Sequence, residues 1–461
     1  MIIQEPERPI AIDLFAGAGG MTLGFEQAGF DVLLSVEIDP IHCAIHQFNF
    51  PFWEVLCKSV VELTGEEIRS YPFIKKRDID VIFGGPPCQG FSLMGKRVLE
   101  DPRNSLVFHF LRIINELKPK YFVMENVAGL TVGQSKQILL EIIASFKECD
   151  YDIKEDYQVL NAAFFGVPQS RERLFLIGCR KGLELPEYPQ PITKPRKGKS
   201  LSKLFPDLNL PHTPTVWDAI GDLPEVERYS ELYKRDWVKG KFGKPSPYAE
   251  KLRGLQKDNN DYSYNRKYDA RILTSSLRTK HTQKSIARFE KTKPGETEKI
   301  SRFLKLDPEG ICNTLRAGTP SSRGAHTSPR PIHPFTPRCI TVREAARLHS
   351  YPDWYQFHVT KWHGCRQIGN SVPPLLAKSV ASQIIKVLGI SPSQPEQVIS
   401  FREKQLIQFN MSKAAEFYGV DPHVIEPRIR KLRLGASQIC ELNRSSHTKF
   451  PKEAIAMLFI S

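Results

Sequence analysis

The sequence of 461 residues contains no run of about 18 apolar residues, which is the length that a helix needs to cross a bilayer. Its start, MIIQEPERPIAIDLF, lacks the basic and then apolar stretches of a secretory signal peptide. The nine cysteines are scattered without a CxxC pair, so neither a zinc ribbon nor a disulfide framework is indicated, and no metal site is expected. These absences argue against a membrane or secreted protein and predict a reduced, cytoplasmic one.

The glycine-rich segment Asp13–Gly20 lacks the third glycine of a dinucleotide-binding fingerprint, and no Gly-Lys-Ser/Thr of a P-loop follows it. A tight turn between a strand and a helix would explain these glycines structurally, but glycines here also let the backbone approach a ligand. Glu37 ends the next strand-like run and can accept hydrogen bonds from both hydroxyls of a ribose. A nucleoside cofactor without a pyrophosphate fits best, and S-adenosyl-L-methionine is the commonest of these.

The first 180 residues alternate apolar strand-like runs with amphipathic stretches, which predicts an α/β fold with a mostly parallel sheet. Ligands of such sheets bind beyond the carboxyl ends of the strands, so the chemistry is expected there. Later in the chain, a loop is predicted around Gly369. The predicted strands are 10–15, 32–37, 81–83, 121–124 and 174–177, and the predicted helices are 106–117, 135–146, 282–291, 341–349 and 374–388.

The positive charge is concentrated in one segment. The chain has 65 Lys and Arg against 51 Asp and Glu, a net charge of +14. Residues 180–340 hold 32 basic and 18 acidic residues, a surplus as large as that of the whole chain, whereas residues 1–179 hold 17 and 24. Because tyrosines and tryptophans are interleaved with these charges, the segment indicates a nucleic-acid surface rather than a merely solvated one.

Cys88 lies in the sequence Gly-Gly-Pro-Pro-Cys-Gln-Gly-Phe-Ser, directly after a predicted strand. Two prolines and two glycines make a rigid bend that would hold the thiol at the carboxyl edge of the sheet, which suggests a nucleophile. Glu125 ends the next strand-like run and is a candidate acid. Arg171 and Arg173 alternate along an extended segment, so they are expected to point the same way.

Seven blocks of this sequence resemble, in order, those of the DNA (cytosine-5)-methyltransferase family of bacterial restriction–modification systems. Among them, Pro-Pro-Cys-Gln-Gly-Phe-Ser and Glu-Asn-Val (125–127) are the most specific. The resemblance implies a Rossmann-like S-adenosylmethionine-dependent methyltransferase domain with an inserted, mostly irregular or β target-recognition domain. The blocks are 13–25, 37–39, 84–92, 125–127, 169–178, 341–348 and 367–374.

The same resemblance divides the chain into four parts. Residues 1–179 would form the first part of the catalytic domain, 180–340 the target-recognition domain, and 341–390 the return to the catalytic domain. Residues 391–461 form a C-terminal extension that the resemblance does not cover. The spacing of Ala414, Ala415, Gly419 and Val420 in it is weakly typical of a helix-turn-helix.

Carried onto matching positions, the resemblance implies a role for each candidate residue. Cys88 would attack carbon 6 of a cytosine flipped out of double-stranded DNA, Glu125 would contact the cytosine ring, and Arg171 and Arg173 would stabilise the intermediate. The methyl group of S-adenosyl-L-methionine would then go to carbon 5. Cofactor-binding residues would be Phe15, Gly17, Gly19, Glu37 and Asn370, and DNA-contacting residues would be Ser92, Arg97 and Arg316.

One position departs from the family pattern. An Asp usually follows the third strand and faces the adenine amine, whereas the matching stretch here reads Leu-Cys-Lys-Ser-Val (56–60), without a carboxylate.

Two alternative functions stay open, a catalytically silent DNA-binding regulator and an RNA cytosine-5 methyltransferase. We expect a nucleoid-associated monomer without a membrane partner. Its methylation would protect DNA from a cognate restriction endonuclease that acts on the same site, or would mark the DNA epigenetically.

Overall fold

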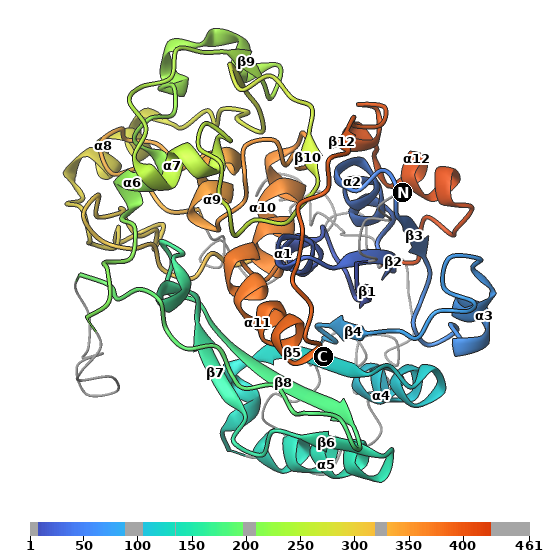
Figure 1. Ribbon diagram of the computed structural model, residues 1–461. Helices are drawn as coiled ribbons and strands as arrows, with labels where there is room; N and C mark the ends of the chain where they lie inside the picture. Colours follow the sequence, from blue (N-terminus) through green and yellow to red (C-terminus); the bar gives the residue numbers. More distant parts are fainter. Residues whose placement is uncertain (1–7, 88–104, 134, 197–208, 319–329, 426–461) are drawn as a thin grey trace, which may run out of the picture.

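The computed structural model describes residues 8–87, 105–133, 135–196, 209–318 and 330–425. Its centre is an eight-stranded sheet in the order β3-β2-β1-β4-β5-β8-β6, with β7 paired to β8 (Figure 1). Strands β1 to β5 run parallel, whereas β8 is antiparallel to β5, β6 and β7. The strands are β1 (Ile10–Leu14), β2 (Asp31–Glu37), β3 (Glu54–Cys57), β4 (Val81–Gly84), β5 (Tyr121–Val127), β6 (Tyr151–Ile153), β7 (Gln158–Asn161) and β8 (Glu172–Arg180).

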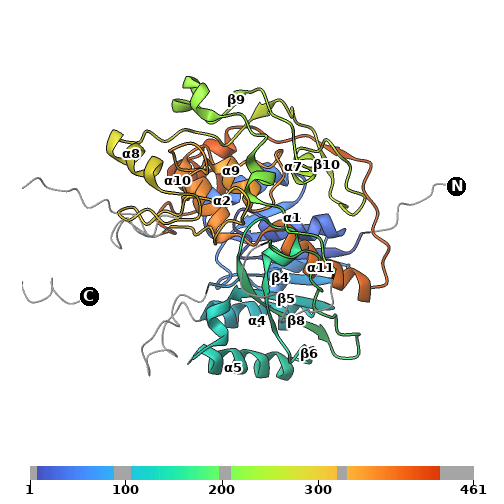
Figure 2. The same ribbon diagram turned by 90° about the vertical axis from the view of Figure 1, so that its left-hand side faces the viewer.

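Helices cover both faces of this sheet, as the predicted Rossmann-like α/β fold requires (Figures 1 and 2). Helices α3 (Gly65–Ser70), α4 (Ser105–Leu117) and α5 (Ser135–Glu148) share a buried apolar cluster with one face. Helices α1 (Gly20–Ala28) and α11 (Pro374–Val387) pack on the other. Alternate residues of β1 divide between the two clusters, because successive side chains of a strand point to opposite faces.

Helix α11 belongs to the core although it is more than 300 residues from α1 in sequence. A Cβ atom on Gly24 would lie 2.4 Å from the Cβ of Ala377, so glycine lets the two helices approach closely. Helix α9 (Val342–Leu348) precedes α11 and begins with a capping box, in which Thr341 and Glu344 satisfy each other's backbone N–H groups. The segment 341–390 is therefore continuous with the sheet domain.

The predicted strands and helices are confirmed, but the predicted loop around Gly369 is wrong. Residues Lys361–Asn370 form helix α10. A Cβ atom on Gly369 would lie 2.2 Å from the backbone nitrogen of Ala317. The glycine is needed for the close approach of another segment to the helix, not for a reversal of the chain.

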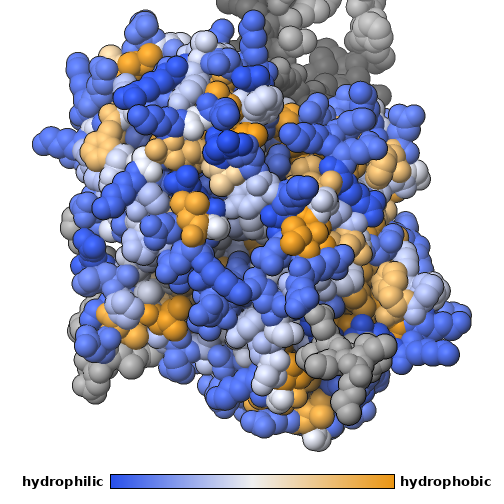
Figure 3. Space-filling view, turned by 45° about the horizontal axis from the view of Figure 1, so that its top comes forward, coloured by the Kyte–Doolittle hydropathy of each residue, from blue (hydrophilic) through white to orange (hydrophobic). Residues whose placement is uncertain are grey.

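The basic segment contains little regular structure, as expected, and much of it forms the upper left of Figure 1. Figure 3 shows a face of the molecule on which hydrophilic residues predominate and hydrophobic ones form small separate groups. The segment is anchored to α1 through Arg266 and Glu26, a fully buried ion pair 2.7 Å apart. Its elements are α6 (Val216–Ile220), η4 (Val226–Arg228), η5 (Ser230–Tyr233), β9 (Val238–Lys239), α7 (Pro247–Leu252), β10 (Asn265–Arg266), β11 (Ile272–Leu273) and α8 (Gln283–Lys291).

The C-terminal extension runs back over the catalytic domain. Strand β12 (Val398–Ile399) pairs in parallel with β10, and η8 (Leu406–Gln408) and helix α12 (Met411–Tyr418) both contact helix α2 (Pro40–Asn49). The second helix of the predicted helix-turn-helix would fall after Ile425, outside the described residues. In the part of the chain that the structure describes, no helix is long and apolar enough to cross a membrane.

Candidate active site

A cavity of about 530 Å³ opens at the carboxyl ends of strands β1 to β5, where the sequence predicted the chemistry. Its volume lies in the range of small-molecule sites, roughly 300–1,000 Å³. It collects residues that are far apart in the sequence. The expected site residues that line it are Phe15, Gly17, Glu37, Glu125, Arg173 and Asn370.

The glycine-rich turn after β1 forms one wall of the cavity. Phe15 and Gly17 have positive φ angles of 65° and 56°, and a Cβ atom on Gly17 would meet nothing within 4 Å, so its outer side is open. The backbone N–H of Gly17 donates a 2.7 Å hydrogen bond to Glu37 Oε2. Gly19 is not among the residues that line the cavity, because it faces the ring of Phe50, 2.6 Å from where its Cβ would stand.

The expected nucleoside cofactor fits this wall. Glu37 is held at the end of β2 by backbone N–H groups: those of Ile38 and Asp39 donate to Oε1 and that of Gly17 donates to Oε2, so Oε2 keeps a lone pair for a ribose hydroxyl. The open side of Gly17 allows a ligand to approach the backbone. S-adenosyl-L-methionine needs this combination, and Phe15, Gly17, Glu37 and Asn370 would hold it.

The end of the cavity at β3 confirms that the family's usual carboxylate is missing there. Lys58, Ser59 and Val60 line it, and the Lys58 ammonium is 2.7 Å from Glu67 Oε2. The Ser59 hydroxyl accepts a 3.2 Å hydrogen bond from the backbone of Val61. No Asp follows β3 at this end of the cavity to face an adenine amine.

Glu125 and Arg173 form a buried ion pair at the other end of the cavity. Strands β5 and β8 bring them together, with Glu125 Oε1 2.7 Å from Arg173 Nε and the side chains only 13% and 14% exposed. Burial raises the pKa of Glu125 above its usual value, and Arg173 and Arg171 oppose this shift. Such a carboxyl holds a proton more readily than an exposed Glu does, which suits acid–base work.

Gly85 provides the space that this carboxyl occupies. A Cβ atom at residue 85 would lie 2.6 Å from Glu125 Oε2. The neighbouring Asn126 side chain donates a 3.0 Å hydrogen bond to the carbonyl of Pro86. The Gly-Gly-Pro-Pro bend is thus fixed against the end of β5, and Pro86 and Pro87 line the cavity. Cys88, Ser92 and Arg97 themselves lie outside the described residues.

Arg171 is buried and does not line the cavity. Its guanidinium donates 2.8 Å hydrogen bonds to the carbonyls of Leu315 and Gly369. Burial lowers its pKa, and the nearby charge of Arg173 adds to this effect. Of Arg171 and Arg173, only Arg173 lines the cavity, whereas Arg171 joins its own segment to those of Leu315 and Gly369.

Residues around Arg171 fix the end of the basic segment beside the cavity. Gln169 Oε1 accepts a 3.0 Å hydrogen bond from the backbone of Leu315, and the Thr314 hydroxyl donates a 2.7 Å hydrogen bond to the carbonyl of Ser170. Arg316, a candidate DNA contact, follows directly and is exposed. The basic segment therefore reaches the edge of the cavity at this residue.

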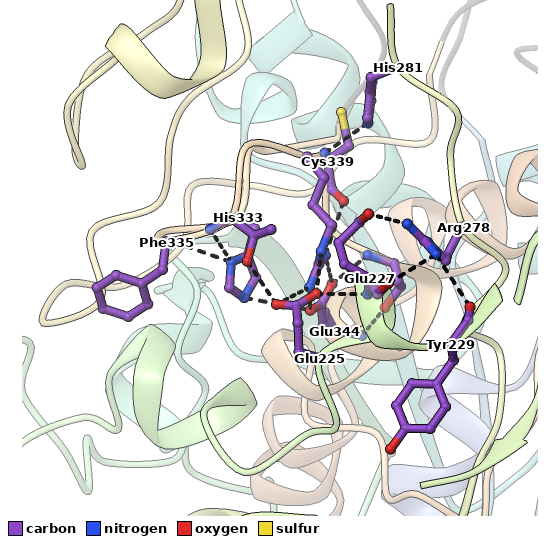
Figure 4. A network of polar contacts seen from close by, with 12 residues as sticks. Glu225, Glu227, Tyr229, Arg278, His281, His333, Phe335, Cys339 and Glu344 are labelled. Carbon is purple, nitrogen blue, oxygen red and sulfur yellow. Dashed lines mark hydrogen bonds and ion pairs between the residues drawn. The ribbon is translucent and has the colours of Figure 1, made fainter. Parts of the chain in front are cut away.

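The basic segment is also attached through a buried network around Arg338 (Figure 4). The Arg338 guanidinium contacts Glu344, at the start of α9, at 2.8 Å and Glu225, next to η4, at 3.0 Å. Burial alone would raise the pKa of Glu344, but Arg338 outweighs it and lowers this pKa to about 2. His333 packs beside both carboxylates, whereas Phe335 points away from the network (Figure 4).

Arg366 and Ile425 are among the cavity-lining residues that were not predicted from the sequence. Arg366 lines the cavity and lies 3.0 Å from Asp39 Oδ2. The helical spacing between Arg366 and Asn370 could have identified it, had a helix been predicted there. Ile425, in the C-terminal extension, also lines the cavity, and no local pattern marks it.

Comparisons with known proteins agree with this geometry. The family model for C-5 cytosine-specific DNA methylase matches residues 10–386. The chain is 57% identical over 423 residues, 92% of its length and 95% of the relative's, to the type II methyltransferase M.XorII of Xanthomonas oryzae pv. oryzae. It is 34% identical to M1.HphI of Haemophilus parahaemolyticus, over 82% of this chain and 86% of that one.

A solved structure is also similar. It is described as a DNA modification methyltransferase encoded within an E. coli prophage, and it is 35% identical to this chain with a TM-score of 0.66. The similarity covers 83% of this chain and all of that one.

Proposed function

The chain belongs to the C-5 cytosine-specific DNA methylase family and is a type II DNA cytosine-5 methyltransferase that uses S-adenosyl-L-methionine; from this premise we propose how its residues divide the reaction. The observation that carries the proposal is that Glu37, Pro87, Glu125 and Arg173 line one cavity. A cofactor held at Glu37 and a base held at Glu125 would share this space.

Cys88 is the nucleophile in this proposal. Carbon 5 of cytosine is too weak a nucleophile to take a methyl group directly. When the Cys88 thiolate adds to carbon 6, the ring becomes enamine-like and carbon 5 becomes nucleophilic, so one difficult step is divided into two easier ones. After methylation, a base removes the proton from carbon 5 and the carbon–sulfur bond breaks by β-elimination.

Glu125 and the two arginines stabilise the charge that develops during the addition. The Glu125 carboxyl contacts ring nitrogen 3 and the exocyclic amine, where a raised pKa favours a shared proton. Arg173 holds this carboxyl and the base, and Arg171 keeps their surroundings rigid. Interactions that strengthen as charge develops contribute to the rate rather than only to binding.

The cofactor supplies an electrophilic methyl group, and the protein's part is to orient it. Glu37 binds the ribose hydroxyls, and Phe15, Gly17 and Asn370 line the rest of the cofactor's place. Gly19 contributes indirectly, because its packing against Phe50 fixes the turn. Apart from Asn370, which ends helix α10, these groups lie at or directly after the ends of parallel strands of one sheet.

The target cytosine has to leave the double helix to reach the cavity, at a cost of roughly a few kcal/mol. We assign the contacts that offset this cost to residues 180–340, the proposed target-recognition domain, with Arg316 at the cavity edge, and also to Ser92 and Arg97, which follow Cys88 in the sequence. Residues 1–179 and 341–390 form the catalytic domain. In this division the basic segment would recognise the DNA sequence, and the sheet domain would carry out the methyl transfer.

In the cell, we propose that the enzyme protects DNA from a restriction endonuclease that recognises the same sequence. The type II relatives support this role. The enzyme would act as a monomer, because a single chain provides every group that the proposal uses. It would work at the nucleoid, where its DNA substrate lies.

Covalent trapping tests the proposal. Duplex DNA made with 5-fluorocytosine cannot lose a proton from carbon 5, so elimination stalls and the enzyme stays joined to the DNA. With S-adenosyl-L-methionine, the wild-type protein should give a protein–DNA species that survives denaturing electrophoresis, and Cys88→Ser should give none while still binding the duplex. A Cys88→Ser species, or no wild-type species on bound DNA, would refute the assigned nucleophile.

The two alternatives predict different results. A silent regulator would bind DNA without transferring labelled methyl groups to it. An RNA methyltransferase would label tRNA in preference to DNA when both are offered together. We expect labelled duplex DNA and unlabelled tRNA.

A further inference from the structure

The C-terminal extension packs against the cofactor turn from behind. Leu406 and Ile407 are buried in one apolar cluster with Ala18 of the glycine-rich turn and with residues of α2. The backbone carbonyl of Ile407 accepts a 3.1 Å hydrogen bond from Val359, and Phe401 stacks on Phe48 of α2 at 5.1 Å. The extension is therefore part of the structure that supports the cavity.

Helix α12 then carries the chain along α2 and β3 (Figure 1). The Tyr418 hydroxyl donates a 2.8 Å hydrogen bond to Gln47, and Tyr418 and Val420 pack on a buried cluster of Cys43, Val55 and Cys57. The helix ends at Gly419, which has a φ of 66°. This packing directs the chain toward the end of β3.

A turn at Asp421 brings Ile425 to the cavity. The Asp421 carboxylate accepts a 2.7 Å hydrogen bond from the backbone of His423, and its carbonyl accepts a 3.0 Å hydrogen bond from Val424. Ile425 lines the cavity together with Lys58, Ser59 and Val60, and is half-buried. An apolar side chain thus stands at the end of the cavity where no Asp follows β3.

The order of the strands indicates which part of the cofactor reaches this end. The cavity runs from β3, through Glu37 of β2 and the turn after β1, to Glu125 of β5. The methyl group has to face the base beside Glu125, and the ribose hydroxyls face Glu37. The purine ring is attached at the opposite side of the ribose from the sulfonium, so it extends toward β3 and Ile425.

We propose that Ile425 is a cofactor-binding residue, which packs against the purine ring of S-adenosyl-L-methionine and makes residues 391–425 part of the methyltransferase site. The inference rests on the proposed placement of the ribose at Glu37. Apolar contact would supply at this end the affinity for adenine that an Asp–amine hydrogen bond supplies elsewhere in the family. The extension would then act on the cofactor and not on the DNA.

The test is the affinity of the full chain for S-adenosylhomocysteine, measured by isothermal titration calorimetry without DNA. Ile425→Ala should weaken binding about 3- to 10-fold, the range for losing partly buried apolar carbons, and Ile425→Asp should weaken it more. His423→Ala is the matched control, because that side chain is 72% exposed and only two residues away, and it should leave the affinity unchanged. In turnover, Ile425→Ala should raise KM for the cofactor while kcat and the affinity for DNA stay as in wild type.

The Glu37→Ala variant distinguishes a failure of the role of Ile425 from a failure of the proposed cofactor site. If Glu37→Ala abolishes binding while both Ile425 variants bind like wild type, the role of Ile425 is wrong and the cofactor site stands. If Glu37→Ala binds like wild type, the cofactor site itself is misplaced and the inference fails with it. Deleting residues 421–461 provides a second variant: weaker binding of S-adenosylhomocysteine with unchanged DNA affinity supports the inference, and the reverse pattern would overturn it in favour of the helix-turn-helix.

Discussion

Glu125 is the residue on which the chemistry of the cavity depends most. It is buried, paired with Arg173 at 2.7 Å, and close to the open space that a cytosine would enter. We predict that Glu125→Gln lowers kcat about 100- to 1,000-fold, because the amide can neither carry the charge nor share the proton that the addition requires. Single-turnover transfer of labelled methyl groups measures this.

DNA affinity should survive in that variant, since Glu125 is assigned to the chemistry. Glu155→Gln, at an exposed ion pair with Lys147, is the control and should be as active as wild type. A Glu125→Gln enzyme within threefold of the wild-type rate would remove Glu125 from the mechanism.

A further prediction for a single residue concerns His46 and the pH dependence of stability. Burial lowers its pKa from 6.5 to about 3. Between these values the unfolded chain binds a proton that the folded chain does not, so His46 makes the unfolding free energy fall as pH falls below 6.5, by about 1.4 kcal/mol per pH unit. Buried Asp13, whose pKa is raised by burial, acts in the opposite direction, so the test is a difference between variants.

Urea unfolding at pH 6 and pH 5 measures this slope. His46→Gln should remove about 1.4 kcal/mol per pH unit from it, and His423→Gln, at an exposed site, should not. Equal slopes for wild type and His46→Gln would contradict the assignment.

Individual site residues could be predicted from the sequence where the conformation of the backbone restricts which residue types can occur. A glycine-rich turn after a predicted strand and a carboxylate at the end of the next predicted strand indicated Gly17 and Glu37. The role of Arg171 on the intermediate stays a prediction, and its partners, the carbonyls of Leu315 and Gly369, could not be predicted because they are distant in sequence. Ile425 could not be predicted, because only the packing of α12 on α2 brings it to the cavity.

At the scale of elements, the Arg338 network joins α9 to the basic segment. Glu225 and Glu344 both bind its guanidinium. We predict that Arg338→Met destabilises the protein by about 3–5 kcal/mol, because it leaves two carboxylates without their buried partner. Chemical denaturation measures the change.

Arg271→Met is the matched control, since Arg271 pairs with Asp269 at a site that is 71% exposed, and it should leave the stability close to that of wild type. Adding Glu344→Gln to Arg338→Met should recover part of the loss, because it removes an unpaired charge. Equal stability of Arg338→Met and wild type would show that the network does not anchor the segment.

Helices and strands with a strong apolar period were predicted well. Helix α10 was missed because it lacks such a period. It contains Gly364 and Gly369 and only a short buried stripe, so local propensity favours a loop. Contacts with α9 and with Arg316–Ala317 stabilise it instead. Tertiary contacts of this kind leave no local period in a sequence.

At the scale of the whole molecule, the net charge of +14 describes one segment rather than the surface as a whole. We predict that affinity for duplex DNA falls at least about 10-fold between 50 and 200 mM salt, because phosphate contacts release bound counterions. Fluorescence anisotropy across this range measures the slope. A salt-independent affinity would mean that the basic segment does not contact phosphates.

The central claim is that the site around Glu37, Glu125 and Cys88 methylates cytosines in DNA. Bisulfite sequencing of DNA from cells that express the chain tests this most directly, because 5-methylcytosine resists conversion. We predict unconverted cytosines at one recurring short sequence with wild type and none with an equally expressed Cys88→Ser variant. Complete conversion with the wild-type protein, or the same protected sequence with Cys88→Ser, would contradict the account.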